Sequence, residues 1–516
     1  MKRTASETSS LHRGLILAAL IAAGEAVFLL PFVLARVFRP TFLDVFGVTN
    51  LQLGTAFSLY GIVAMVSYFA GGPLAARFSA RRLMTAALLA TGLGGVVLTG
   101  IPSVRVMNFL WAFWGLTTIF LFWAAMLRAT REWGGATRQG RAYGLLDGGR
   151  GLLAAVIASF TVLVFALALP SDVSATTPEQ RAAAFRTVIW VFTGLVLGIA
   201  LLVWVVVPDI TPQDDRGNQQ KLSLNGILGV CRMPAVWLQA VIVVCAYVGY
   251  KATDDFSLLA RDVLDFDEVA ASGIGTLSFW IRAIVAVVAG YLGDRIDSSR
   301  VIAWGFSILV AGSLLIASGA VVPGVAWMLI TTIVATSIGI YAIRGVYFAL
   351  LAEGAVPLTF TGSAIGVVSF VGFTPDVFMG PLMGVLLDSS PGVLGHQHVF
   401  ASVAAFGVVG LLATIAFRRT TRTHRAGVLR HRTDPLLEHE QTLLHAGHEN
   451  RAAVEEWVCA PRSTKSRPRP EWRRIKHADL NRVQGVRDIE DMEPVPVVGL
   501  ISEVSLHVQI MRTGWQ

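Results

Sequence analysis

The sequence predicts an all-α integral membrane protein with twelve transmembrane helices in two pseudo-symmetric six-helix bundles, followed by a polar tail. Three observations support this prediction. Of the 516 residues, 54% are hydrophobic and 15% are charged, whereas a soluble protein carries about 25% charged residues. The hydrophobic residues form long runs, and the motifs beside these runs are repeated in the second half of the chain. The net charge of +8 lies between the runs, so we do not expect a nucleic-acid partner.

The hydrophobic runs have the length of membrane spans. A helix needs about 20 predominantly apolar residues to cross the hydrocarbon core, and lipid requires every backbone amide to be bonded within the segment. The first run contains Glu25, Pro31 and Arg36 and is too long for a cleavable signal peptide. We predict twelve spans at 14–38, 51–75, 83–102, 106–127, 141–169, 186–207, 234–257, 271–293, 300–319, 325–349, 362–387 and 398–417.

The short loops predict the orientation of these spans. Most of the arginines and lysines in the loops lie on the side of the two termini, whereas the opposite side holds only Arg39, Arg105, Arg181, Arg186 and Arg261. Positive loops stay on the cytoplasmic side. We therefore predict a multi-pass protein of the plasma (inner) membrane with both termini in the cytoplasm.

The same pattern divides the chain into four parts. We expect an N-terminal half at 1–207, a central cytoplasmic loop at 208–233, a C-terminal half at 234–417 and a tail at 418–516. The tail is rich in charged residues and lacks sustained hydrophobic periodicity, so we predict that it is mostly disordered and cytoplasmic.

An internal repeat relates the two halves. The second span ends in Gly72-Pro73-Leu74-Ala75-Ala76-Arg77, followed by Arg81, and the eighth ends in Gly290-Tyr291-Leu292-Gly293-Asp294-Arg295. A second pair of matching segments, Gly140-Arg141-Ala142-Tyr143-Gly144 and Gly362-Ser363-Ala364-Ile365-Gly366, has nearly the same offset. Two repeats of this kind leave a central cleft that rocking of the halves exposes to one side at a time.

The loop motif resembles the signature of the major facilitator superfamily of secondary transporters. This resemblance covers about residues 1–417 and implies alternating access. It also implies a gating role for the motif residues Gly72, Arg77, Arg81, Gly290, Asp294 and Arg295. Where the family has an acidic residue in the first motif, this chain has Ala76, so we expect a weaker latch in the first half.

Ten charged residues lie inside the predicted spans and away from their end residues, where an unpaired charge costs at least about 2.5 kcal/mol. In a regular helix Glu25, Leu29, Phe32 and Arg36 form one stripe, and we expect that stripe to face the cleft. The alternative is that Arg36 extends to the membrane interface beside Arg39. The charged residues are Glu25, Arg36, Asp147, Arg150, Lys251, Asp254, Asp255, Arg282, Arg344 and Asp376.

Arg36 and Lys251 occupy related positions in the two halves, and two facing cations would bind an anion. The segments 36–42, 250–251 and 255–257 resemble the organophosphate/phosphate antiporter branch of the superfamily, in which such residues grip phosphate. The resemblance implies that Arg36 and Lys251 hold a phosphate, sulfonate or carboxylate. In the alternative, Lys251 pairs with Asp254 or Asp255 and is not free for substrate.

Two carboxylates are candidates for proton coupling. Asp376 follows Pro375 deep in the eleventh span, and Glu25 is its rival. Either can instead be a neutral acid bonded to a neighbouring helix. Asp147 and Arg150 are three residues apart, which favours a structural ion pair.

Aromatic and basic residues of the second half complete the predicted site. We expect Tyr247, Tyr341 and Arg344 to contact the substrate, although tyrosines in spans more often serve packing. Arg344 or Arg282 can alternatively pair with the buried acids.

These features predict a transporter of a small organic anion of the sugar phosphate, sugar acid or sulfonate type. Proton symport or anion exchange would drive it. The alternatives are a proton-coupled carrier of drugs or neutral sugars and a transporter-like sensor. The sequence contains no His-Glu-x-x-His, Gly-x-Ser-x-Gly or Walker-type motif, so we do not expect an enzyme. Nor do we expect a metal or a cofactor, and we predict a monomer whose partners are the substrate, a proton and the bilayer.

Overall fold

The computed structural model describes residues 10–134, 139–210, 224–320, 326–357 and 360–422. The predicted disorder of the tail therefore concerns residues that lie almost entirely outside the described part. Within that part, twelve helical stretches are long and apolar enough to cross a membrane, which confirms the predicted number. The protein is a multi-pass integral membrane protein.

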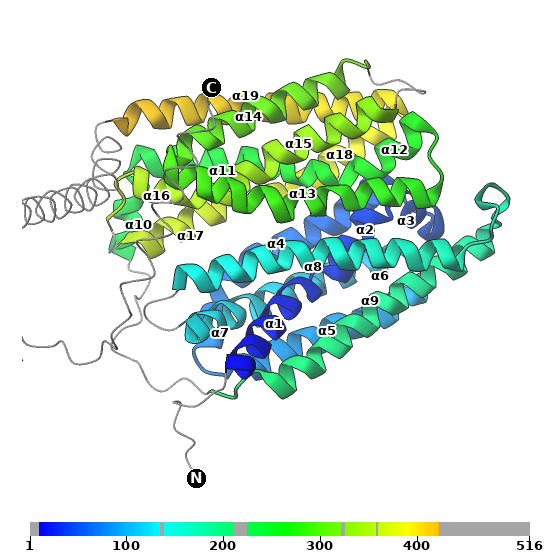
Figure 1. Cartoon of the computed structure of the whole chain (residues 1–516), viewed down its shortest axis with the longest axis horizontal. Coiled ribbons are helices and arrows are strands. Elements are labelled where there is room, and N and C mark those ends of the chain that lie inside the picture. Colours follow the sequence, from blue (N-terminus) through cyan, green and yellow to red (C-terminus); the bar gives the residue numbers. More distant parts are fainter. Residues whose placement is uncertain (1–9, 135–138, 211–223, 321–325, 358–359, 423–516) are drawn as a thin grey trace, which may run out of the picture. The chain divides into compact units, whose positions relative to one another are not determined.

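The first six spans form the N-terminal bundle, which is blue to green in Figure 1. Thr49 and Thr177 begin two of its helices with capping boxes that include Gln52 and Gln180, and such caps satisfy free amide groups at a helix start. Its elements are α1 (Ser10–Ala26), the π-helix η1 (Leu29–Val33), α2 (Leu34–Val37), α3 (Arg39–Phe46), α4 (Asn50–Ala75), α5 (Ala80–Thr99), α6 (Val104–Gly115), the π-helix η2 (Leu116–Trp123), α7 (Ala124–Gly134), α8 (Gln139–Ala168), the short 3-10 helix η3 (Val173–Ala175) and α9 (Pro178–Val206).

The last six spans form the C-terminal bundle, green to orange in Figure 1. A short helix, α10 (Leu224–Cys231), precedes it within the segment expected to be a loop. The bundle comprises α11 (Pro234–Ala252), the 3-10 helix η4 (Thr253–Asp255), α12 (Phe256–Leu264), α13 (Glu268–Arg295), α14 (Ser298–Ala317), α15 (Ala326–Val346), the 3-10 helix η5 (Tyr347–Ala349), α16 (Leu350–Glu353), α17 (Thr361–Gly372), α18 (Pro375–Ser389) and α19 (Val393–Thr420).

Several spans are not the continuous α-helices that the hydrophobic runs predict. Spans 1 and 4 contain the π-helices η1 and η2, and spans 7 and 10 contain the 3-10 helices η4 and η5. Span 11 is interrupted between Gly372 and Pro375, because proline has no backbone N–H and cannot continue the hydrogen bonds of the preceding helix. Hydropathy detects the length of a run, but it does not detect such local changes of winding.

Span 4 also ends later than predicted, at Gly134 instead of residue 127. Polar groups support this extra length. Arg128 donates to the backbone carbonyls of Ala75 and Phe78, and its side chain lies 3.1 Å from Glu132 one turn further on.

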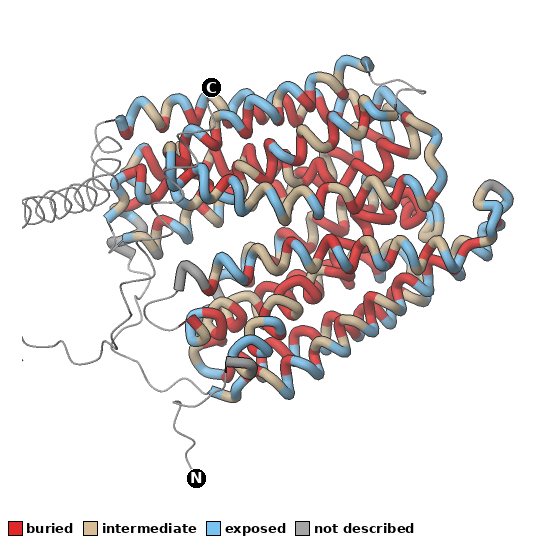
Figure 2. The backbone as a smooth tube through the Cα atoms, in the orientation of Figure 1, coloured by how far each residue is buried: buried red, intermediate tan, exposed pale blue. Residues whose placement is uncertain are grey.

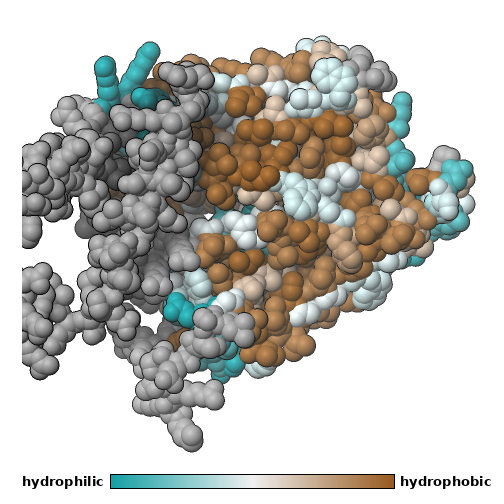
Figure 3. All heavy atoms as spheres, in the orientation of Figure 1, coloured by the Kyte–Doolittle hydropathy of each residue, from teal (hydrophilic) through white to brown (hydrophobic). Residues whose placement is uncertain are grey.

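The apolar residues lie in two places, in the interior of the bundles and on the outer surface. One set is buried between helices within each bundle (Figure 2), and a second set covers the middle of the visible face, with hydrophilic residues at its two ends (Figure 3). Phe109, Leu167, Val205 and Trp327 are each at least 70% exposed. Such large exposed apolar residues are consistent with lipid contact.

The two bundles contact each other through α4 with α18 and through α8 with α13. Glycines allow close approach of the first pair. A Cβ atom at Gly54 would lie 2.2 Å from the carbonyl oxygen of Gly380, and one at Gly384 would lie 2.4 Å from the Cα of Leu51. The glycines of span 5 do not serve such a close approach in this structure, because a Cβ at Gly144 or Gly148 would meet nothing within 4 Å.

α1 begins and α19 ends at one end of the helices, on the left of Figure 1, and we call this the terminal end. The opposite end, called the far end, is closed by polar contacts between the bundles. Arg261 of α12 donates to Asp44 of α3 at 2.9 Å, and Arg181 of α9 pairs with Glu268 of α13. Asp388 of α18 accepts the Leu51 amide of α4 at 2.8 Å.

Candidate functional site

A cavity of about 420 Å³ lies between the two bundles, within the usual range for small-molecule sites. Its walls come from α1, η1, α2, α4, η2 and α8 on one side and from α11, α13, α15, η5 and α18 on the other. All seven residues predicted to bind substrate or protons line this cavity: Glu25, Arg36, Tyr247, Lys251, Tyr341, Arg344 and Asp376.

Breaks in the helices place three of these residues. Arg36 follows the π-helix η1, which contains Pro31. Lys251 lies in the last turn of α11, just before η4, and Asp376 is in the first turn of α18 after Pro375. Since η1 is wound more widely than an α-helix, the predicted regular stripe from Glu25 to Arg36 is wrong in its geometry. Both residues nevertheless line the cavity.

Arg36, Lys251, Asp254 and Asp376 form one charge cluster, which we call the far cluster. The Nε of Arg36 lies 2.5 Å from Oδ1 of Asp254, and Nζ of Lys251 lies 3.3 Å from its other oxygen. Lys251 also approaches Asp376 at 3.6 Å. The structure therefore has the alternative arrangement for Lys251, in which a carboxylate one turn away pairs with it.

Arg36 is buried and does not extend to the interface, since only 2% of it is exposed. It connects the bundles, because its partner Asp254 lies on η4 of the C-terminal bundle. The Arg36 guanidinium also donates to the Tyr250 hydroxyl at 3.1 Å, and Ser257 donates to the Arg36 carbonyl at 3.0 Å. Its neighbour Arg39 donates to Asn50.

Asp376 has a second polar partner in the far cluster. The Tyr247 hydroxyl donates to its Oδ2 at 3.1 Å. The sequence offered no basic residue within a turn of Asp376, and the structure supplies Lys251 from another helix. This acid is therefore held by one cation and one hydroxyl at the cavity wall.

Glu25, Asp147, Arg150 and Arg282 form a second cluster nearer the terminal end, the near cluster. Arg150 lies 3.5 Å from Glu25 and 3.8 Å from Asp147, its predicted partner. Arg282 of α13 approaches the same two acids at 3.8 and 3.7 Å. This cluster thus also spans both bundles, with two arginines facing two carboxylates.

Arg344 differs from the other cavity cations. Among the residues that the structure describes, no carboxylate lies within ion-pair distance of it, and its Nη1 has no hydrogen-bond partner. Instead, its guanidinium lies 3.7 Å from the centre of the Tyr250 ring and 5.3 Å from that of Tyr247. Arg36 contacts the same Tyr250 ring at 4.5 Å.

The predicted gating residues lie away from the cavity, at the terminal end. Arg81 pairs with Asp209 at 2.8 Å and stacks on Trp204, and Arg82 reaches the same carboxylate at 3.0 Å. Asp209 lies beyond the end of span 6, and the Ser79 hydroxyl, followed by Arg82 and Arg81, holds its pKa below the usual range. Gly72, Arg77 and Asp294 are exposed, Gly290 is partly exposed, and Arg295 stacks on Tyr291.

The C-terminal bundle has a corresponding bridge with its charges exchanged. Asp297, in the loop between α13 and α14, pairs with Arg418 near the end of α19 at 2.7 Å. Glu353 accepts the backbone amide of Ser298 at 2.7 Å. In the first half the first turn of α5 supplies the cation and the segment after span 6 supplies the acid. In the second half the residue before α14 supplies the acid, and the end of α19 supplies the cation.

The sequence interpretation missed a buried histidine cluster near the far end. Nδ1 of His396 lies 2.6 Å from Asp255, and Nε2 lies 3.2 Å from Asp262. Asp262 also accepts from Arg261, which bonds to Asp44 of the other bundle. No local spacing could have indicated these contacts, because the partners of His396 are more than 130 residues away in the sequence.

The described residues contain no group of three or more His, Cys, Asp or Glu side chains arranged to hold a metal ion. Cys231 and Cys245 are free thiols.

Comparison with known proteins agrees with this architecture. The sequence profile described as Major Facilitator Superfamily matches residues 15–375. The inner membrane protein YqcE of Escherichia coli (strain K12) is 27% identical over 425 residues, which cover 80% of this chain and 96% of that protein. The inner membrane protein YihN of the same organism is 26% identical, with 72% and 87% covered.

Solved transporters share the fold at low sequence identity. A bacterial homologue of the human lysosomal transporter Spinster, in an inward-facing and unoccupied conformation, superposes with a TM-score of 0.63 at 14% identity. The match covers 81% of this chain and 99% of that one. The nucleoside transporter NupG superposes with a TM-score of 0.59 at 14% identity, covering 79% and 99%.

Proposed function

The chain belongs to the Major Facilitator Superfamily, and from that premise we propose that it is a secondary transporter of a small organic anion. The substrate is of the sugar phosphate, sugar acid or sulfonate type, and transport occurs by alternating access across the plasma (inner) membrane. The observation that carries this proposal is the charge of the cavity, where the five cationic side chains of the wall outnumber the four carboxylates that pair with them. A cavity with this excess favours anions over neutral or cationic solutes.

Both termini are placed in the cytoplasm because of the positive loops, and with this orientation the polar contacts between the bundles support an inward-facing conformation. At the far end Arg261–Asp44 and Arg181–Glu268 join the bundles. The described ion pairs of the terminal loops, such as Arg81–Asp209 and Asp297–Arg418, each stay within one bundle. Substrate would then leave or enter from the cytoplasmic side in this state.

Arg36 and Lys251 act as substrate ligands only after a local rearrangement. Asp254 lies 2.5 Å from Arg36 and 3.3 Å from Lys251, so it occupies the position that a substrate anion would take in a clamp. An incoming anion competes with Asp254 for Arg36. This exchange would couple binding at the cavity to the contact between the bundles.

Proton coupling is assigned to Asp376, with Glu25 as the second candidate. Both line the cavity, and carboxylates inside membrane proteins commonly carry protons. If Asp376 takes up a proton, Lys251 retains Asp254 as a partner. The gating residues Gly72, Arg77, Arg81, Gly290, Asp294 and Arg295 would act at the cytoplasmic loops. Asp209 supplies there the acid that Ala76 lacks.

A second candidate function is the carriage of a neutral, ring-bearing solute. Twelve of the residues that line the cavity are aromatic, and most of the cavity charges pair with one another. Aromatic faces suit the stacking of sugars or bases, and the fold relative NupG is a nucleoside transporter. In this case the buried ions would be structural.

Counterflow in proteoliposomes separates the two functions. Purified full-length protein is reconstituted, and uptake of labelled glucuronate, glucose 6-phosphate, isethionate, glucose and uridine is measured into vesicles preloaded with the same unlabelled compound. We expect at least one anion to accumulate above protein-free liposomes, with glucose and uridine at background. Accumulation of glucose or uridine alone would establish the second function, and background levels for all five would refute the proposed transport of these anions.

A further inference from the structure

We propose that Arg344 and Tyr341 form the primary anion subsite of the cavity and that this subsite takes an organic anion with one negative charge, such as a carboxylate or a sulfonate. The inference rests on the proposed function, because it assigns the substrate class of the same cavity. It selects sugar acids and sulfonates over sugar phosphates. It also places the first contact with the anion on span 10 and not on the clamp of Arg36 and Lys251.

The inference rests on two hydrogen-bond donors of one helix that have no acceptor among the described residues. Arg344 and Tyr341 lie three residues apart on α15, so their side chains share a face of the helix. The Tyr341 hydroxyl and Nη1 of Arg344 are buried and lack a hydrogen-bond partner among the described residues, although both side chains line the cavity. A buried donor without an acceptor is destabilising, because it has lost its hydrogen bond to water without gaining another. A ligand that brings oxygen acceptors removes this cost.

When the cations and carboxylates of the cavity are paired, one positive charge remains uncompensated, and it belongs to Arg344. Asp254, Asp376, Glu25 and Asp147 each lie within 3.8 Å of a cation from the far or near cluster. These four carboxylates compensate Arg36, Lys251, Arg150 and Arg282. Within the described residues only Arg344 remains among the five cations of the wall. One monoanion therefore neutralises the cavity without breaking an existing ion pair.

A second negative charge on the substrate would have no such partner. It would have to displace Asp254 or another carboxylate from its cation, and an uncompensated buried charge is strongly unfavourable. Phosphate monoesters carry nearly two charges at neutral pH, whereas carboxylates and sulfonates carry one. The cavity therefore discriminates between these classes by charge number.

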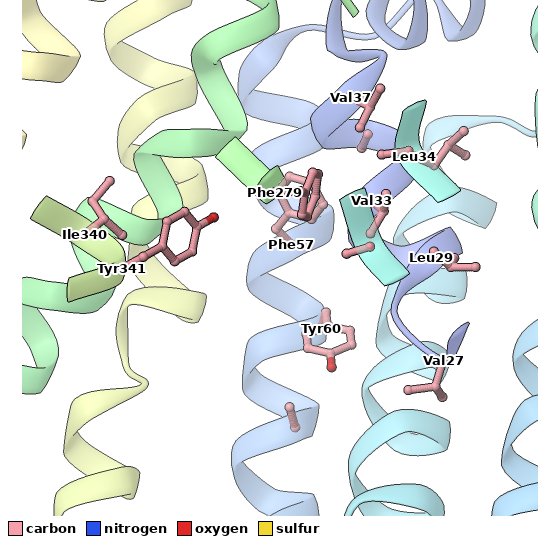
Figure 4. Packing of buried hydrophobic residues seen from close by; sticks show 14 of the residues in the cluster. Val27, Leu29, Val33, Leu34, Val37, Phe57, Tyr60, Phe279, Ile340 and Tyr341 are labelled. Carbon is pink, nitrogen blue, oxygen red and sulfur yellow. The ribbon is translucent and has the colours of Figure 1, made fainter. Parts of the chain in front are cut away.

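The surroundings of Arg344 suit the organic part of such a ligand. Its guanidinium stacks on Tyr250, which leaves the donors at its edge available, and an arginine presents these donors in a planar fork that matches a carboxylate. Figure 4 shows the Tyr341 hydroxyl pointing from α15 toward the side where Phe57 and Phe279 lie, with Ile340 on the other side. Tyr247 and Phe348 add aromatic surface to the wall beside this pair.

The test compares ligands that share a glucose scaffold but differ in charge. Binding of glucuronate, glucose and glucose 6-phosphate to the purified full-length protein is measured by calorimetry at pH 7.5, with isethionate as an unrelated monoanion. We expect glucuronate or isethionate to bind at least tenfold more tightly than glucose 6-phosphate, and glucose to bind at least 100-fold more weakly. Equal or tighter binding of glucose 6-phosphate would overturn the charge assignment. Failure of all the anions to bind the wild type would overturn both proposals.

Variants of span 10 test the subsite itself. We expect Arg344→Gln to weaken monoanion binding at least 50-fold, Arg344→Lys to restore part of it, and Tyr341→Phe to weaken it five- to tenfold. Arg105→Gln is the matched control, because Arg105 is exposed at the far end and its loss should leave affinity unchanged. Elution profile and melting temperature verify folding of each variant. Unchanged affinity in a folded Arg344→Gln protein that still transports anions would refute the subsite and leave the proposed function standing.

Discussion

The far and near clusters have the same composition, two cations and two carboxylates, but they are packed differently. In the far cluster the shortest contact is 2.5 Å, and Arg36, Lys251 and Asp254 are at most 4% exposed. In the near cluster the contacts are 3.5–3.8 Å, and the Asp147 side chain is 64% exposed. The cavity is thus sealed by tight ion pairs on one side and bordered by loose ones on the other.

This difference indicates which ion pairs hold the two bundles together in this state. A buried pair is sensitive to loss of one partner, because the remaining charge is left in a low-dielectric site. In the near cluster the pairs are longer, and those of the exposed Asp147 contribute little to stability. The far cluster is therefore expected to hold the bundles together in this state, while the near cluster can open to ligand and water.

The largest effect is expected at Asp254. Asp254→Asn leaves Arg36 buried without a carboxylate and should lower the free energy of unfolding by about 3–5 kcal/mol. Thermal unfolding of the purified protein, followed by tryptophan fluorescence, measures it. The double variant Arg36→Gln/Asp254→Asn should recover most of the loss, because neither position then carries a charge.

Asp44→Asn is the matched control for this prediction. Asp44 pairs with Arg261 at the far end, and both side chains are at least 30% exposed, so the change should cost at most about 1 kcal/mol. A double variant at Arg36 and Asp254 that is as unstable as the sum of the single variants would contradict the coupling.

A smaller and more selective effect is expected at the two candidate proton carriers. Asp376→Asn should abolish the stimulation of anion uptake by an inward-directed proton gradient while counterflow continues, since Lys251 keeps Asp254 as a partner. Glu25→Gln should retain the stimulation. Uptake into proteoliposomes with and without a pH gradient measures both. Loss of stimulation in Glu25→Gln alone would move proton coupling to the near cluster.

The smallest effect is expected at the loop bridge of the N-terminal bundle. Because the pKa of Asp209 is lowered in the folded protein, its stabilising contribution is complete at neutral pH. The contribution is lost as the pH falls below the ordinary aspartate value of about 3.9 and through the lowered one. Asp209→Asn should therefore cost at most about 1 kcal/mol at pH 7 and less at pH 2. Melting temperatures at the two pH values and at high salt test it, and an equal loss at both pH values would argue against an ionic contribution.

The sequence predicted the number of spans because a hydrophobic run of fixed length has few alternatives in lipid. It also identified seven side chains that line one cavity. Five of them are charged, and charged residues inside spans rarely face lipid. It could not show how these charges pair. Asp254 was an expected partner of Lys251, but its closer contact with Arg36 joins residues 218 positions apart, and sequence spacing carries no information on such contacts.

The sequence interpretation also did not predict the local changes of helical winding. Pro31 and Pro375 were visible, yet the π-helix after Phe28 and the break before Asp376 depend on how neighbouring helices replace the lost hydrogen bonds. That Arg344 has no carboxylate partner among the described residues is a finding of the same kind, because it follows from which carboxylates the fold gives to the other four cations.

The backbone contact between Gly54 and Gly380 gives α4 and α18 a point of rotation near the far end of the molecule. Because the two backbones touch there without intervening side chains, we expect α4 and α18 to rotate against one another at this point. A tilt of about 10° there displaces the opposite end of α4, about 30 Å away, by about 5 Å. Rotation about this contact would therefore move the helices apart at the terminal end. A methyl group added at Gly54 would block this rotation, because it would clash with the backbone of Gly380.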